Sequence, residues 1–98
     1  MIHLQIIGKE NAQIKSLLRS AIQDGKIKSF AITQVKGGLR IQHAKYPGSI
    51  NFTQKNNVLL ATLKCQNTSR EWQLLEALVG RLAYHFRDDM SAVNIQFD

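Results

Sequence analysis

The sequence has very little that could cross-link the chain or anchor it. It contains one cysteine, Cys65, and one proline among 98 residues, and no stretch approaches the roughly 20 apolar residues of a membrane-spanning helix. One thiol can form neither an intrachain disulfide nor a multi-thiolate metal site, which is typical of a reduced compartment. The first residues also lack the basic segment of an export signal. We therefore expect a cytoplasmic protein without a membrane segment.

Acidic residues are missing from the middle of the chain. Residues 25–70 contain eight Lys and Arg and no Asp or Glu, whereas residues 71–98 carry a net charge of −3. The formal charge of the whole chain is +6. A basic segment of this kind attracts polyanions over a long range and says nothing about the fold. RNA or the ribosome is therefore the partner that the charge favours.

Apolar residues are plentiful and periodic. They make up 44% of the chain, which is enough for one small domain over residues 1–98. Apolar and polar residues alternate over residues 2–7, which predicts a half-buried strand. An apolar stripe over residues 14–22 predicts an amphipathic helix that ends at Gly25.

The last third of the chain predicts a second helix and a final strand. Thr68 and Glu71 have the spacing of a capping box, which indicates a helix start. Apolar residues then continue at helical spacing as far as residue 86. Alternation over residues 93–97 predicts the strand that ends the chain.

Three turn signals divide the middle of the chain into four strands. They are Gly37-Gly38, Pro47-Gly48 and Asn56-Asn57. Residues that lie opposite each other in paired strands share a face, so counting outward from the turns sorts the side chains. One face is apolar, and the other is mostly polar and is called the open face below. The apolar face collects Phe30, Ile32, Leu39, Ile41, His43, Ile50, Phe52, Leu59, Ala61, Leu63 and Cys65.

The elements follow in the order β-α-β-β-β-β-α-β. Two amphipathic helices need an apolar sheet face to cover, and only one is available. The sequence therefore predicts an α+β two-layer sandwich, with a mostly antiparallel sheet and both helices on one face.

The open face is the candidate binding site. Arg40, Lys55 and Lys64 project from it among hydroxyl and amide side chains, and Lys36 and Lys45 lie on its turns. Flexible cations beside neutral hydrogen-bonding groups suit phosphate contacts. The face has no aromatic residue on which a base could stack, which disfavours sequence-specific recognition of single strands. We expect a non-enzymatic domain that binds RNA or another polyanion and needs no cofactor.

Two other interpretations of the open face remain. Its polar residues can simply solvate an exposed sheet, or a partner can cover it. The second interpretation makes the chain a protein-interaction or homodimerisation module. The apolar residues that favour a covered face are Ala31, Val35, Ala44, Val58 and Leu60.

Gly80 suggests a different surface for a homodimer. A glycine inside a helix costs about 1 kcal/mol relative to alanine, so some close contact usually compensates. That contact is either with the sheet or, across a dimer, with a second helix. Ala77, Gly80 and Tyr84 form the stripe that would meet the second helix.

His43 raises an enzymatic alternative. It is close in sequence to Arg40, Lys45 and Tyr46, and a histidine beside cations can serve general acid-base catalysis in a small, metal-free ribonuclease of the toxin type. The turn signals, however, place His43 opposite Ile32 and Phe52 on the apolar face. We therefore expect a hydrogen-bonded core histidine.

Two further groups are expected to have no chemical role. His85 and Asp88 have helical spacing, but two ligands are too few for a metal site, and we expect a surface pair. No base lies near Cys65 in sequence, so we expect it to be a small buried hydrophobic residue.

Overall fold

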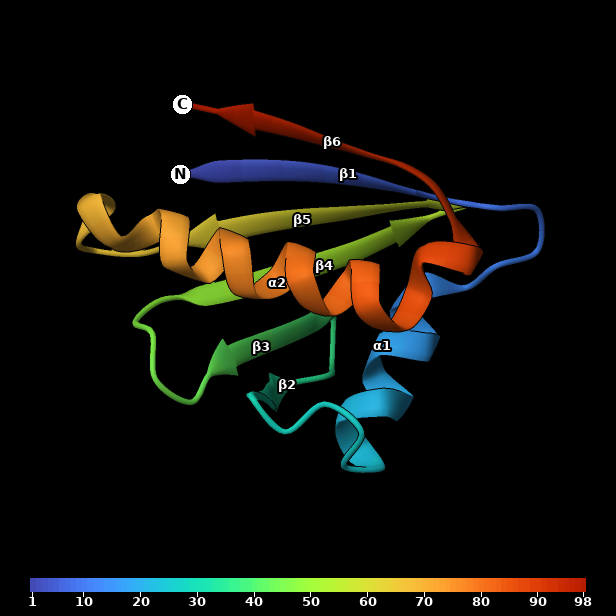
Figure 1. The fold of residues 1–98 in the computed structure, drawn as a ribbon, viewed down its shortest axis with the longest axis horizontal. Helices are drawn as coiled ribbons and strands as arrows, with labels where there is room; N and C mark the ends of the chain where they lie inside the picture. Colours follow the sequence, from blue (N-terminus) through green and yellow to red (C-terminus); the bar gives the residue numbers. More distant parts are fainter.

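The structure is a computed structural model that describes residues 1–98. It contains six strands, two α-helices and two short 3₁₀ helices (Figure 1). In chain order they are β1 (Ile2–Gly8), α1 (Ile14–Gln23), β2 (Phe30–Gln34), β3 (Leu39–His43), β4 (Ser49–Lys55), β5 (Val58–Lys64), η1 (Thr68–Arg70), α2 (Glu71–Phe86), η2 (Arg87–Asp89) and β6 (Met90–Phe97). The predicted α+β class and element order are confirmed.

All six strands belong to one antiparallel sheet with the order β2-β3-β4-β5-β1-β6. The first strand of the chain therefore lies between β5 and the last strand, and the two chain ends lie side by side (Figure 1). The sequence did not predict this strand order. It leaves β2 and β6 as the two edges of the sheet.

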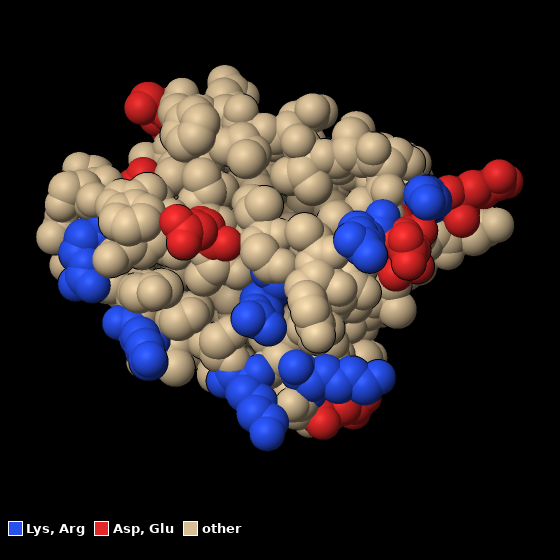
Figure 2. Space-filling model, in the orientation of Figure 1, with Lys and Arg blue, Asp and Glu red and all other residues tan.

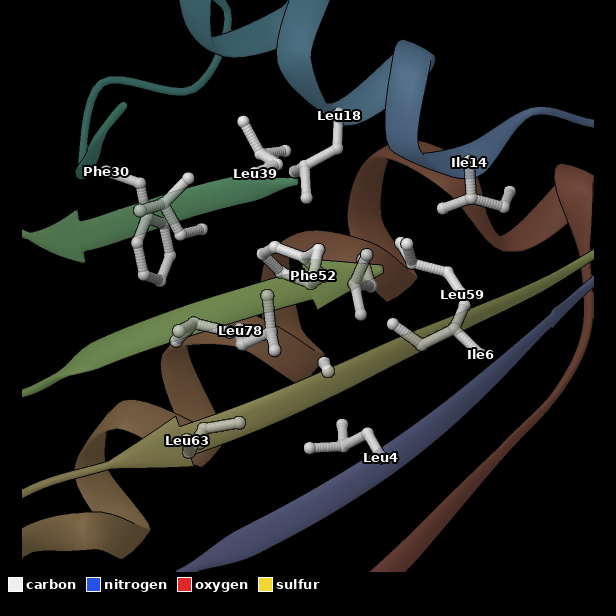
Figure 3. Close-up of a cluster of buried hydrophobic side chains, with 14 of the residues drawn as sticks. Leu4, Ile6, Ile14, Leu18, Phe30, Leu39, Phe52, Leu59, Leu63 and Leu78 are labelled. Atoms are coloured by element: carbon white, nitrogen blue, oxygen red, sulfur yellow. The ribbon is translucent and has the colours of Figure 1, made fainter. Parts of the chain in front are cut away.

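One hydrophobic core holds the sheet and the helices together. Its 19 buried residues come from both helices, from β1, from Ile27 and, in each of the strands β2 to β5, from the face that the sequence predicted to be apolar. Figure 3 shows side chains of α1, α2 and the strands meeting in it. The largest fully buried members are Phe52, Leu4, Ile6, Ile14, Leu18, Ile27, Ile41, Ile50, Leu59, Leu63, Leu74 and Leu78.

Helix α1 ends as the sequence predicts. Gly25 has a φ of 79°, a left-handed conformation that glycine adopts at little cost. Its N–H donates to the Ile22 carbonyl at 3.2 Å, and the N–H of Lys26 donates to the Ala21 carbonyl at 2.9 Å. These two bonds form a Schellman motif, which satisfies the last carbonyl groups of the helix.

The predicted register is right for one hairpin and wrong for two. Lys55 pairs with Val58 around the Asn56-Asn57 turn, as expected. In contrast, residues 30–32 of β2 are shifted by two residues relative to β3: the pair of Gln34 and Arg40 is already shifted by one, and a bulge between Ile32 and Gln34 adds the second. β3 and β4 are shifted by four, because residues 44–48 form a longer loop than a Pro-Gly turn. These shifts are even, so the side chains of β3 and β4 and of residues 30–32 keep their predicted faces. After the bulge, Gln34 lies opposite Arg40 and therefore on the open face.

The predicted capping box is also wrong. Residues 68–70 form the 3₁₀ helix η1, so α2 begins three residues later, at Glu71. The cap of η1 is Asn67, whose side-chain oxygen accepts bonds from the Ser69 N–H at 3.2 Å and from its hydroxyl at 2.6 Å. The Glu71 carboxylate instead lies 3.1 Å from the amino group of Met1.

Neither α-helix is long and apolar enough to cross a membrane.

Candidate nucleic-acid interface

The open face consists of the sheet side chains that point away from the core. A single row crosses five strands, because each member lies opposite the next in the register: Arg40, Asn51, Thr62, His3 and Gln96. All five side chains are exposed or half-buried. The row presents one cation, two amides, a hydroxyl and an imidazole, so most of it offers neutral hydrogen-bonding groups.

Arg40 is oriented by its neighbours in the sheet. Its Nε donates to the Asn51 side-chain oxygen at 2.8 Å, and its own carbonyl accepts a bond from the Thr33 hydroxyl at 3.3 Å. The residue is exposed. A guanidinium group has five N–H donors, so this bond to Asn51 leaves four of them for a ligand.

The three predicted cations are spread over the sheet. Lys55 lies opposite Val58 at one end of β5, and Lys64 ends the same strand six residues later. At about 3.3 Å per residue, the two lysines are about 20 Å apart along the strands. Arg40 lies between them, because its partner Asn51 faces Thr62 of β5. The arrangement could contact several phosphates of one strand but not enclose a single phosphate.

The two turn lysines, Lys36 and Lys45, lie at opposite ends of this array of cations. Lys36 lies in the turn before β3, at the end of the sheet where β4 reaches Lys55. Lys45 lies in the loop after β3, which leads to Ser49, the partner of Lys64. Cations are therefore present at both ends of the open face, with Arg40 in the middle.

None of the 13 Lys and Arg side chains forms an ion pair. The structure has two ion pairs, one between Met1 and Glu71 and one between His3 and Asp98, at 3.1 and 3.5 Å. An incoming anion would therefore not have to displace a carboxylate from any of the basic side chains. This is the main electrostatic property of the open face.

The largest hollow of the molecule lies at the Lys64 end of the sheet. It has a volume of about 860 Å³, and its polar lining includes Gln42, Ser49, Lys64, Arg70 and Glu71. The Glu71 charge is balanced by the Met1 amino group, so the two cations give the hollow a positive charge. The sequence could not predict this hollow, because its wall depends on β1 lying beside β5 and bringing the chain start to α2.

The apolar residues of the open face do not form one patch. Ala31 and Val35 lie in or next to the edge strand β2, whereas Val58 and Leu60 lie on β5, with two strands between them. Ala44 lies in the loop after β3. The five residues that would favour a covered face are therefore dispersed and form no joint apolar patch.

His43 is half-buried at the border of the core, and it lies opposite Phe30 instead of the predicted Ile32 and Phe52. Its ring stacks on Tyr46 at 4.4 Å between centroids. Nδ1 accepts backbone N–H bonds from Lys45 and Tyr46 at 3.0 and 3.2 Å. Burial, and secondarily the charge of Lys45, lower the pKa of His43 from its ordinary value.

This geometry does not assemble the ribonuclease constellation. Arg40 and His43 are three residues apart on one strand, so their side chains lie on opposite faces of the sheet. A neutral ring that accepts at Nδ1 carries its proton on Nε2 and has no free basic nitrogen. His43 is therefore a positioned structural group of the 43–46 loop.

The stripe on α2 borders a smaller hollow, of about 410 Å³, beside His43 and Tyr46. Ala77, Gly80 and Tyr84 all line it, and Tyr84 is 78% exposed. A Cβ atom added to Gly80 would meet no atom within 4 Å. Close packing of Gly80 on the sheet, one of the two expected reasons for this glycine, is therefore wrong.

The other singled-out residues form no site. His85 and Asp88 make no ion pair, and Nε2 of His85 has no hydrogen-bond partner. Cys65 is half-buried and lines the large hollow, so the expectation of a buried cysteine is wrong. The structure gathers no group of three metal-ligating side chains.

No family model matches the chain, and the curated proteins and solved structures that were compared with it show no significant similarity.

Proposed function

We propose that the protein is a non-enzymatic domain that binds RNA, free or within a ribosome, through the open face. The observation that carries the proposal is the set of unpaired cations on that face. Arg40, Lys55 and Lys64 are exposed and have no acidic partner. Their charges are available for the release of counterions from a polyanion, which supplies most of the free energy of sequence-independent binding.

The neutral groups between the cations support the same function. Asn51, Thr62 and Gln96 offer donors and acceptors across the width of the sheet. Such groups position phosphates and sugars, and they carry no sequence information by themselves. The open face presents no Phe, Tyr or Trp on its strands, so base stacking contributes little there. We therefore expect RNA binding with little sequence preference, in the cytoplasm.

The large hollow supports one end of the binding path. Lys64 and Arg70 line it together, and Arg70 donates through Nε to the Gln73 side chain at 2.9 Å, which orients its guanidinium. A phosphate in this hollow would meet two cations with different geometries. Lys acts as a compact charge, whereas Arg offers planar, bidentate contacts.

The test compares two variants with the same net charge. Arg40→Glu, Lys55→Glu and Lys64→Glu together change the formal charge from +6 to zero. The matched control reverses three exposed arginines of the helical segments, Arg19, Arg81 and Arg87. Binding of a labelled oligouridine is measured by fluorescence anisotropy at low salt.

We expect the open-face variant to lose binding and the control to retain most of it. Both variants carry the same total charge, so a difference between them reports where the RNA lies. Equal losses in the two variants, or unchanged binding in the open-face variant, would contradict the proposal.

A further inference from the structure

The edge strand β6 lacks the features that usually protect the edge of a sheet. Its eight residues, Met90–Phe97, include no charged residue and no proline. Natural edge strands are usually short, bulged or charged, because unpaired backbone groups invite another strand. The register of β6 is irregular only at its start, opposite Ile7 and Gly8. The opposite edge, β2, has five residues and a bulge, so β6 is the unprotected one.

The register shows which backbone groups of β6 are free. The Asp98 N–H donates to the Met1 carbonyl at 3.2 Å. Residues of an antiparallel strand direct their N–H and C=O groups alternately toward one neighbour and the other. The backbone groups of Asn94 and Gln96 therefore bond to β1. The backbone N–H and C=O groups of Val93, Ile95 and Phe97 point to the free side of the strand. No further strand lies on that side.

The same three residues form an apolar stripe, of which Val93 packs against the core and Ile95 and Phe97 are exposed. Val93, Ile95 and Phe97 lie opposite Ile6, Leu4 and Ile2, so they share the core side of the sheet. Their partners are at most 4% exposed, but Ile95 is 39% and Phe97 67% exposed. Figure 1 shows the reason: α2 crosses over the middle of the sheet, and β6 lies beyond it.

We propose that β6 pairs with β6 of a second copy of this chain, in an antiparallel arrangement that continues the sheet. A two-fold axis perpendicular to the sheet near Ile95 places the free groups of Val93, Ile95 and Phe97 opposite the same groups of the partner. It also keeps the helices of both copies on one side, so the two apolar stripes meet. The inference does not depend on RNA binding.

The charge distribution favours a second copy as the occupant. Each copy carries +6, so two copies can meet only where the cations are far away. Along the upper edge of the molecule, over β6, Figure 2 shows no Lys or Arg, whereas they gather lower, around α1 and the β2 side of the sheet. This edge without cations is thus where two basic copies meet with the least repulsion.

The size of the contact sets its strength. One strand pair with its apolar stripe buries less than the roughly 800 Å² per partner of a standard interface. Smaller interfaces are typically weak, so we expect a dissociation constant on the order of micromolar and not nanomolar.

The first test measures mass against concentration by sedimentation equilibrium. We expect a shift from 11.1 kDa toward twice that mass as the concentration passes through the micromolar range. Ile95→Lys places like charges across the two-fold axis and should weaken association by about tenfold or more. The matched control is Leu17→Lys on α1, which starts from an apolar residue of nearly the same exposure, 37% against 39%, and should leave the association unchanged.

Hydrogen exchange of the wild-type chain gives a second test that needs no variant. The amides of Val93, Ile95 and Phe97 should exchange quickly in dilute solution and slow down as the concentration rises. Protection at Ala77, Gly80 and Tyr84 instead would place the dimer on α2 and overturn the proposal. A monomer at millimolar concentration would overturn it as well, and would leave β6 as an edge for an extended segment of another protein.

Discussion

Gly80→Ala should stabilise the protein, although glycines in folded proteins often resist substitution. Gly80 is the tenth of the sixteen residues of α2, well inside the helix. A Cβ atom at this position would meet no atom within 4 Å, so the substitution introduces no clash. The gain is then the full difference in helix propensity, about 1 kcal/mol. For a domain of this size, that corresponds to a rise in melting temperature of about 4 to 8 °C.

Thermal unfolding followed by circular dichroism measures this effect, with Gly48→Ala as the matched glycine control. Gly48 has a φ of 106°, and a Cβ there would lie 2.5 Å from the Lys64 carbonyl oxygen. That variant should lose at least about 1 to 3 kcal/mol through backbone strain alone. An unchanged or lower melting temperature for Gly80→Ala would refute the reasoning, because it would mean that the exposed side of α2 is covered. If the melting temperature of Gly80→Ala is lowered even at low protein concentration, self-association would be excluded as what covers this side of α2.

Two smaller predictions follow from the loops. The pKa of His43 is lowered by burial and by Lys45, so the unfolded chain binds a proton at this ring before the folded chain does as the pH falls. The contribution of His43 to stability should therefore be complete above about pH 6.5 and should decrease as the pH falls toward the folded-state pKa. NMR titration of the ring, together with urea unfolding at several pH values, would detect this decrease. A titration of His43 at or above its ordinary pKa would contradict this. Asn56 has a φ of 54°, a left-handed conformation that glycine adopts easily and alanine does not. Asn56→Gly should therefore be tolerated, whereas Asn56→Ala should lower the free energy of unfolding in urea by on the order of 1 kcal/mol. Equal stabilities of the two variants would show that the turn does not hold this residue in the left-handed conformation.

The sequence predicted the faces of the sheet better than its pairing. Phe52 and Ile41 were placed on the buried face correctly, although their partner strands were shifted by four residues, because an even shift leaves the alternation intact. The length of the 44–48 loop was not predicted, and within this loop Gly48 closely approaches the Lys64 carbonyl oxygen of a different strand. His43 kept its predicted face but gained different neighbours, because the pairing of β3 with both β2 and β4 is shifted.

The candidate site was predictable in its residues but not in its shape. Alternation alone places Arg40, Lys55 and Lys64 on one side of the sheet, and the structure keeps them there. Their spacing and the hollow at Lys64 depend on the strand order, which no local pattern reports. The free edge of β6 was hidden for the same reason, because the sequence predicts a strand there without showing which strands lie beside it.

The salt dependence of RNA binding tests the central claim most directly. If three to five cations of the open face and its turns contact phosphates, the logarithm of the binding constant should fall with the logarithm of the salt concentration with a slope of about −2 to −3.5. Affinity for oligouridine would then decrease roughly 20-fold to 100-fold between about 50 and about 200 mM salt. The charge reversal of Arg40, Lys55 and Lys64 should remove most of this slope. A binding constant that does not change with salt would contradict phosphate contact by the open face.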